Sequence, residues 1–378
     1  MSEYQYYEFL ALDRPLNDRQ RGELRSLSTR ADITPTSFVN EYHWGNFRGE
    51  PSDMMQRYFD AHLYLTNWGT HHLMFRLPKR LLDYYTAERY CLGDSANAWL
   101  HGDHVILDLT SEDESGDWDG TDETRLGSIV GIRAEIAAGD LRPLYLAWLL
   151  CAQVELDDDE LEPPVPPNLG SLTAAQRGLA DFLRIDDDLI DAAADTSEDS
   201  AIDELRDSDL VEWIGELSPL ERDSALFAFL QDDDPHLRAE LLRRIRDTAT
   251  DLPAASAPRT VGELLATASE RREARERLIE QGRAKERLRR EQQAALARDK
   301  RLDTLAARED AAWLEVGDMI GTTKPKEYDR AIVLLADLRA LADRSGQAEV
   351  FDQRYQRLRV EHQRKPSFIE RLDRARLG

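Results

Sequence analysis

The stretch Ala96-Asn-Ala-Trp-Leu-His101-Gly102-Asp103-His104-Val-Ile-Leu-Asp-Leu109 gives the clearest indication of secondary structure in the chain. Two apolar runs, 96–101 and 104–109, flank a two-residue Gly-Asp loop. Glycine readily adopts the positive φ angles that a tight hairpin turn requires. The stretch therefore predicts a β-hairpin, and with it an antiparallel sheet.

Strands and helices alternate on the N-terminal side of this hairpin. Bulky aromatic and aliphatic runs predict further strands, and runs with apolar residues at helical spacing predict helices. Asn17 and Gln20 stand three residues apart, as in a capping box at a helix start. The expected strands lie at 4–12, 37–44, 61–67 and 71–77, and the expected helices at 16–28, 52–59 and 78–90. We expect one sheet covered by helices.

Composition changes divide the chain into three expected parts. From Leu126 onward the apolar spacing is helical, which predicts an α+β N-terminal domain over 1–161 with a helical end. The run Glu162-Pro-Pro-Val-Pro-Pro-Asn168 favours extended backbone and suggests a linker before a helical domain at 169–253. Residues 256–378 are expected to form a long charged helix and a C-terminal helical hairpin, separable from the rest.

The long helix is indicated by Glu, Arg, Lys, Gln and Ala residues that continue without proline to about Leu305. Oppositely charged residues recur three and four positions apart, which supports an exposed helix. Leu288, Ala295 and Leu302 keep heptad spacing, but Gly282 interrupts the pattern. We therefore expect a short coiled-coil seam against another helix, rather than a sustained homodimeric coiled coil.

Charge is distributed unevenly along the 378 residues. The chain holds 49 Lys and Arg against 74 Asp and Glu, a net charge of −25. Residues 256–378 contain 27 basic and 22 acidic residues, so this part is +5 and residues 1–255 are −30. The acidic part should repel nucleic acid and anionic membranes, whereas the basic tail could bind phosphate or an acidic protein surface.

Composition also points to a cellular compartment. No apolar run approaches the roughly 18 residues of a membrane helix, and the start MSEYQYYEF lacks the pattern of a secretion signal. Cys91 and Cys151 are too few for a disulfide framework and are expected to be core thiols. We expect a cytoplasmic protein with no membrane partner.

Four segments near the C-terminus carry a family resemblance: Trp313-Leu-Glu-Val-Gly317, Tyr328-Asp-Arg-Ala-Ile-Val-Leu-Leu335, Asp337-Leu-Arg339 and Arg357-Leu-Arg-Val-Glu-His-Gln-Arg-Lys-Pro-Ser-Phe-Ile-Glu-Arg-Leu372. Over roughly the last 65 residues the chain resembles the helical C-terminal tail of bacterial SWIM zinc-finger proteins. The resemblance implies an interaction scaffold. That family's zinc module needs a Cys-x-Cys pair and a later Cys-x-His. This chain has only Cys91 and Cys151, which form no such pair, so no zinc function is carried over. The N-terminal region resembles an uncharacterised bacterial protein family.

Two sets of C-terminal residues are candidates for this scaffold. The first set has helical spacing and should form the core of the hairpin: Trp313, Tyr328, Ala331, Leu335, Phe351, Tyr355 and Leu358. The second set is basic and could contact a partner: Arg354, Arg357, Arg359, Arg364, Lys365 and Arg371. The basic residues either form a solvated helix face, dock on an acidic protein surface that could belong to this chain, or bind nucleic acid.

The sequence offers weak candidates for a metal site. Histidines occur in pairs, His71 with His72 and His101 with His104, with His43 and His62 nearby in sequence. A hairpin would place His101 opposite His104 on one face, but polar residues also belong at an exposed hairpin end. The acidic loop 111–124 departs from the calcium-loop template, because Ser115 and Leu126 would take positions that need Asp and Glu. We expect no cofactor.

Three functions remain as alternatives. The chain has no Gly-rich phosphate loop, nucleophile elbow or zinc-protease motif. A non-enzymatic scaffold or adaptor mediating protein–protein interaction is the leading hypothesis. A nucleic-acid-associated accessory protein that uses the basic C-terminal helices is one alternative. An enzyme with a pocket in the α+β domain is the other, since catalytic carboxylates leave no reliable linear signature.

Overall fold

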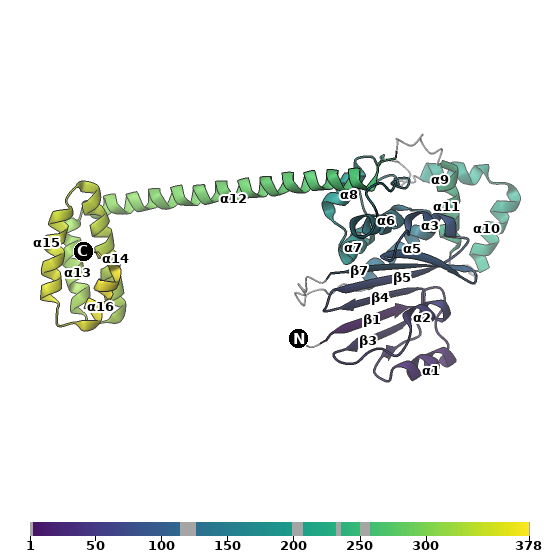
Figure 1. Ribbon diagram of the computed structural model, residues 1–378, viewed down its shortest axis with the longest axis horizontal. Coiled ribbons are helices and arrows are strands. Elements are labelled where there is room, and N and C mark those ends of the chain that lie inside the picture. The colour runs from purple at the N-terminus through teal and green to yellow at the C-terminus, as the bar shows by residue number, and fades with distance from the viewer. Residues whose placement is uncertain (1–2, 114–125, 199–206, 232–235, 250–257, 378) are drawn as a thin grey trace. The chain divides into compact units, whose positions relative to one another are not determined.

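A computed structural model describes residues 3–113, 126–198, 207–231, 236–249 and 258–377 (Figure 1). The chain forms two compact units, Met1–Ala274 and Arg275–Gly378, which we call unit 1 and unit 2. Unit 1 combines a sheet with helices, and unit 2 is helical. The α+β class of the N-terminal part and the helical class of the C-terminal part are confirmed.

The sheet of unit 1 is antiparallel, with strand order β2-β3-β1-β4-β5-β7-β6. Its strands are β1 (Gln5–Leu10), β2 (Asp32–Ile33), β3 (Ser37–Tyr42), β4 (Ala61–Thr66), β5 (Thr70–Pro78), β6 (Ala96–His101) and β7 (His104–Glu112). The predicted hairpin joins β6 to β7, where His101 pairs with His104 and Gly102 has a φ of 56°. Antiparallel neighbours and a turn with positive φ are what the Gly-Asp loop predicted.

Helices surround this sheet. They are α1 (Asp18–Leu27), α2 (Pro51–Arg57), α3 (Tyr84–Tyr90), α4 (Leu126–Ile129), α5 (Gly131–Ala137), α6 (Arg142–Val154), α7 (Ala174–Leu183), α8 (Asp187–Ala194), α9 (Asp207–Glu216), α10 (Pro219–Gln231) and α11 (Leu237–Ala249). The capping box predicted at the start of α1 is present, because the Asn17 side chain accepts a hydrogen bond from the Gln20 amide and the Gln20 side chain accepts one from the Asn17 amide.

Each face of the sheet has its own core. Strand side chains alternate between faces, so Tyr6 and Tyr7 of β1 point to opposite sides. One core lies against α3–α8 and contains Tyr6, Leu65, Leu73, Phe75 and Leu107. The other lies against α1 and α2 and contains Tyr7, Phe9, Phe38, Met55 and Phe59. The sheet is therefore covered on both sides, by different helices on each.

The expected helical domain at 169–253 is not separate from the sheet. Leu179 and Phe182 of α7 and Leu189 of α8 are buried in the same core as the strands. The proline-rich run that suggested a linker is an extended segment fixed against this core. Tyr90 Oη donates to the Pro164 carbonyl at 2.8 Å, and Ser197 Oγ donates to the Pro166 carbonyl at 2.8 Å. Proline excludes helix here, but side chains from other elements hold the segment in place.

The boundary expected at 256 also differs from the structure. Helix α12 (Val261–Ala306) begins inside unit 1, where Val261, Leu264 and Ala268 are buried in the core shared with the sheet. Just before it, Arg259 donates to both carboxylate oxygens of Glu162, at 2.8 and 2.7 Å. The first turns of the long helix therefore belong to unit 1, and the change of unit falls within the helix, at Ala274.

Unit 2 is a helical bundle. Its helices besides the end of α12 are α13 (Glu309–Gly321), α14 (Pro325–Ser345), α15 (Ala348–Glu361) and α16 (Pro366–Ala375). The structure places all seven predicted core residues in one cluster: Tyr328, Ala331, Leu335, Phe351, Tyr355 and Leu358 are buried, and Trp313 packs against them half-buried. Phe368 and Leu372 of α16 complete the cluster. Helix α14 therefore contacts both α15 and α16.

Most of the part of α12 that follows Ala274 is exposed. Leu302 and Leu305 are buried in the core of unit 2, whereas Leu288 and Ala295 of the same expected heptad series are exposed. Arg301 pairs with Asp337 of α14 at 2.7 Å. The seam with another helix is thus limited, in the described residues, to the last turns of α12. No helix in the described ranges combines the length and apolar character needed to cross a membrane.

Candidate functional site

Basic side chains of unit 2 that were candidates for partner contact are mostly engaged within the unit. Arg354 pairs with Asp310 at 2.9 Å, Arg359 with Asp373, and Arg371 with Asp329 at 2.8 Å, while Lys365 Nζ donates to the Ile320 carbonyl at 2.6 Å. Arg357 and Arg364 are exposed, and no partner is found for them within the described ranges. The six residues do not form one unpaired basic surface.

A groove of about 460 Å³ adjoins this set, between α14 and α16. Arg371 and Arg374 line it, and so do the carboxylates of Asp329 and Glu370. Two basic and two acidic side chains balance, so the groove has no excess charge to attract an anion such as a nucleic-acid phosphate.

The histidines noted in the sequence do not converge on one site, although the His62 and His72 rings lie edge to face with 5.5 Å between centroids. His71 faces the helical core, where Nδ1 lies 2.6 Å from the Phe182 carbonyl. His72 points to the opposite face, with Nε2 2.6 Å from Asp108 Oδ1. His101 and His104 are cross-strand neighbours at the hairpin end. No group of three or more potential ligands that could hold a metal ion occurs among the described residues. Most of the acidic loop at 111–124 lies outside those residues.

His62 of β4 is the most deeply buried histidine of this set. Its ring stacks on Phe9 with 3.8 Å between centroids, and its Nδ1 lies 3.0 Å from the Glu8 carbonyl oxygen. Burial, followed by the nearby His72, lowers the pKa of His62 well below its usual value. The ring is therefore neutral at physiological pH. It packs with the aromatic side chains of the core that lies against α1 and α2.

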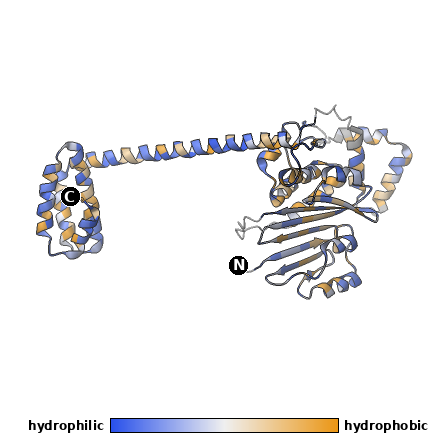
Figure 2. Cartoon of the chain, viewed as in Figure 1, coloured by the Kyte–Doolittle hydropathy of each residue, from blue (hydrophilic) through white to orange (hydrophobic). Residues whose placement is uncertain are grey.

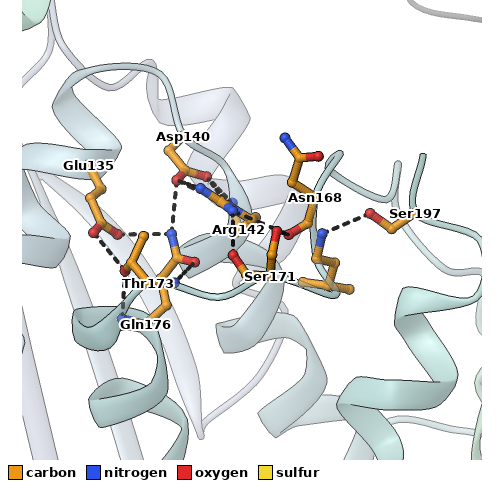
Figure 3. A network of polar contacts seen from close by, with 9 residues as sticks. Glu135, Asp140, Arg142, Asn168, Ser171, Thr173, Gln176 and Ser197 are labelled. Atoms are coloured by element: carbon orange, nitrogen blue, oxygen red, sulfur yellow. Dashed lines mark hydrogen bonds and ion pairs between the residues drawn. The ribbon is translucent and has the colours of Figure 1, made fainter. Parts of the chain in front are cut away.

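A buried polar network joins α5, α6 and α7 (Figure 3). Arg142 donates to Asp140 through Nε and Nη2, and through Nη1 to the carbonyls of Asn168 and Ser171. Gln176 Nε2 donates to Asp140 at 2.8 Å. Figure 3 also shows Glu135, which accepts hydrogen bonds from Thr173 and Gln176. Burial raises the pKa of Glu135. The carboxylates of Glu135 and Asp140 already accept hydrogen bonds from neighbouring side chains. The network is therefore suited to fixing the helices and the segment after the proline-rich run.

A second polar cluster anchors α11 to the end of the sheet. Asp13, which follows β1, lies 2.5 Å from Arg133 of α5 and 3.1 Å from Nε2 of His236, the residue before α11. Burial by itself would raise the pKa of Asp13, but hydrogen bonds from His236 and Arg133 and their charge outweigh it and lower the pKa to about 2. Asp13 is therefore ionised at neutral pH and contributes to holding α11 in place.

Replacing Asp13→Asn is expected to destabilise unit 1 by about 2 kcal/mol at neutral pH. Because the folded-state pKa is depressed, the contribution is full above the ordinary carboxyl pKa of about 4 and is lost as the pH falls through about 2. Urea unfolding at several pH values should show the difference from wild type shrinking over that range. Asp32→Asn, at an exposed position of β2, is the control and should change stability by less than about 0.5 kcal/mol. A difference that does not vary with pH would contradict the assignment.

The least expected surface of unit 1 is an apolar one, on α9 and α10. Seven large apolar side chains are exposed there, and we call them the α9–α10 face: Val211, Ile214, Leu220, Leu226, Phe227, Phe229 and Leu230. In Figure 2 apolar residues can be followed along this pair of helices. Leu220 is 77% exposed, Phe227 62% and Leu230 72%. Soluble proteins rarely expose contiguous apolar patches unless they bind a partner there.

Local interactions explain why α9 and α10 form despite this exposure. Ser218 Oγ accepts from the Glu221 amide and Glu221 Oε2 accepts from the Ser218 amide, a capping box with Pro219 at the first helical position. Glu221 also pairs with Arg244 of α11 at 3.0 Å, and the Arg244 guanidinium lies over the Trp213 ring. The helix pair is thus held on α11 through Glu221 and Trp213, while the seven apolar side chains of the α9–α10 face are exposed in the described part of the chain.

The sequence does contain a signal for this face, although an indirect one. Residues 225–230 read Ala-Leu-Phe-Ala-Phe-Leu and are apolar on more than one side of the helix. A helix with apolar residues all round is normally buried. Such a pattern favours a covered helix at 219–231, and only the structure shows that in the described residues it is not covered.

Comparison of the chain with protein-family models, with curated proteins and with solved structures finds no match in any of the three.

Proposed function

We propose that this protein is a non-enzymatic scaffold or adaptor that binds a protein partner through the α9–α10 face. The observation that carries the proposal is the exposure of its large apolar side chains on two adjacent helices. Transferring one Leu or Phe side chain from water to an apolar contact is worth about 1.5 to 3 kcal/mol. A partner that covers several of them gains enough to offset the cost of association.

The chemistry of the face favours a protein over a nucleic acid. Residues 207–231 contain six acidic residues and one basic residue, a balance of −5. Such a surface repels phosphates and attracts basic side chains. An amphipathic helix with an apolar stripe and basic flanks fits it best, as in other helix-in-groove contacts. The largely paired basic residues of unit 2 lend no support to the nucleic-acid alternative.

Capture of proteins from host lysate, with and without nuclease, tests this proposal. Phe227→Ser combined with Leu230→Ser should reduce the captured protein at least about tenfold, because the partner loses two apolar contacts. A matched control replaces two exposed residues of unit 2, Leu314→Ser and Val333→Ser, and should leave capture unchanged. Circular dichroism should show the same helix content in all three proteins.

A photo-reactive side chain at Val211 identifies what is bound at the face itself. The expected result is a cross-link to one protein species that disappears in the Phe227→Ser, Leu230→Ser protein. Equal capture by wild type and this variant would overturn the proposal. Capture that nuclease abolishes would instead support a nucleic-acid-associated function.

A further inference from the structure

We propose that the partner of the α9–α10 face is a second copy of this chain, which supplies residues 278–288 of its α12. This inference rests on the proposed function and names the occupant of the same site. It follows from three properties of the two segments: which side chains each leaves exposed, how these are spaced, and which charges they have.

On α10 the side opposite α11 presents four residues in a row. Glu221 faces α11 through its ion pair with Arg244, and Ala225 and Ala228, which helical spacing puts on the same side of α10, are half-buried. The opposite side, half a helical turn away, contains Leu220, Asp223, Phe227 and Leu230, and all four are exposed. Their spacing of three, four and three residues is that of a coiled-coil seam.

On α12 a row with the same spacing is exposed. It contains Leu278, Gln281, Lys285 and Leu288. Leu278 is 68% exposed and Leu288 55%, in a part of the helix that is exposed along its whole circumference. Ten residues separate the outer leucines of each row, which corresponds to about 15 Å at 1.5 Å per residue. The two rows are therefore equal in length.

If α10 and α12 align antiparallel, the two rows meet as four pairs of residues, which we call layers. The residues are complementary in three of the four layers. Leu220 then lies opposite Leu288 and Leu230 opposite Leu278, which gives an apolar layer at each end. Between them Asp223 meets Lys285, an opposite-charge pair that fixes the register and direction. In the remaining layer Phe227 meets the aliphatic part of Gln281. A parallel alignment would place Asp223 against Gln281 and Phe227 against Lys285, and would lose the ion pair.

Net charge supports the same pairing. Residues 275–301 of α12 contain ten basic and five acidic residues, a balance of +5, against −5 for residues 207–231. Opposite charges on the two segments favour encounter between copies. Like segments repel each other, which disfavours pairing of α10 with α10 or of α12 with α12.

A charge exchange tests the contact with the full chain. Sedimentation equilibrium of Asp223→Lys and of Lys285→Asp, each alone, should show the association constant reduced at least about tenfold relative to wild type, because like charges then meet in the seam. An equimolar mixture of the two variants should associate as wild type does. In the mixed pair, the side chain substituted at 223 in one copy meets the side chain substituted at 285 in the other, so opposite charges face each other again. The second contact of the same pair joins the native Asp223 of one copy to the native Lys285 of the other.

The control is Arg283→Asp, the same change of charge on the side of α12 opposite the seam, and it should leave association unchanged. Both altered seam positions are exposed, so the single variants should unfold at the wild-type temperature. The inference is overturned by a wild-type chain that stays monomeric wherever it is soluble, by single variants that associate normally, or by a mixture that stays monomeric.

Failure of this inference and failure of the proposed function give different results. If the wild type is monomeric but Phe227→Ser with Leu230→Ser abolishes the cross-link at Val211 to a different protein, only the second-copy assignment is wrong. If that cross-link and the capture are unaffected by the two serine substitutions, the α9–α10 face is not the binding site and both fail.

Discussion

A chain that ends at Ala274 should give one sharp thermal transition, whereas a chain that ends at residue 255 should not fold stably. The shorter chain lacks Val261, Leu264 and Ala268 from the core beneath the sheet. It also lacks Arg259, which leaves the carboxylate of Glu162 without its cationic partner. Losing one partner of a buried pair costs about 3 to 5 kcal/mol, and each large apolar side chain adds about 1.5 to 3 kcal/mol.

These losses together are comparable with the whole stability of a typical domain, about 5 to 15 kcal/mol. Thermal unfolding followed by circular dichroism compares the two fragments directly. Arg259→Met within the longer fragment is the matched intermediate case, because it removes the ion pair and keeps the start of α12. An equally sharp transition at the same temperature for both fragments would contradict the assignment of these residues to unit 1.

Leu335→Ala should destabilise unit 2 by about 2 to 5 kcal/mol and leave unit 1 unchanged. Leu335 is fully buried in the centre of α14, where it contacts a core shared with α13, α15 and α16. Its truncation removes apolar contacts and leaves a cavity. Hydrogen exchange read by mass spectrometry should show faster exchange in residues 309–375 and unchanged exchange in the sheet.

Val333→Ala provides the comparison on the same helix. Val333 is 59% exposed, so its truncation should change stability by no more than about 0.5 kcal/mol. Equal effects of the two substitutions would show that Leu335 is not in the core. The Leu335 variant also separates two locations for partner binding: capture through the α9–α10 face should persist, whereas capture through the basic tail should be lost.

Much of the fold could be predicted because its signals are local. The Gly102-Asp103 turn and the capping box of Asn17 each depend on residues within a few positions of one another. The long helix was equally clear, since its i to i+4 charge pairs and lack of proline suffice. The C-terminal core residues also follow from helical spacing alone.

The domain boundaries could not be predicted, because they depend on contacts between distant residues. Proline excludes helix at 163–167, but only Tyr90 and Ser197, far away in sequence, make that segment part of the core. Similarly, nothing near Arg259 in the sequence indicates its ion pair with Glu162. A composition break predicts where regular structure stops, not where a compact unit ends.

The candidate site was missed for a related reason. The charge pattern of the sequence favoured the C-terminal basic residues as a binding site. Their acidic partners, such as Asp310 and Asp329, come from neighbouring helices, so these ion pairs are apparent only in the folded structure. Phe227 and Leu230 are exposed because no other described segment packs on them, and the sequence around them does not encode this. The apolar content of α10 is typical of a covered helix, and the second copy proposed above would supply the cover.

Neighbouring residues of β1 serve different cores, with Tyr6 on one face of the sheet and Tyr7 on the other. Neither core can therefore melt by itself, because each would take away the strand that supports its neighbour. The two coverings of the sheet should behave as one cooperative folding unit, although they share no helix. Selection on either face of β1 then acts on the stability of both, and a change tolerated by one core must also preserve the strand geometry that the other requires.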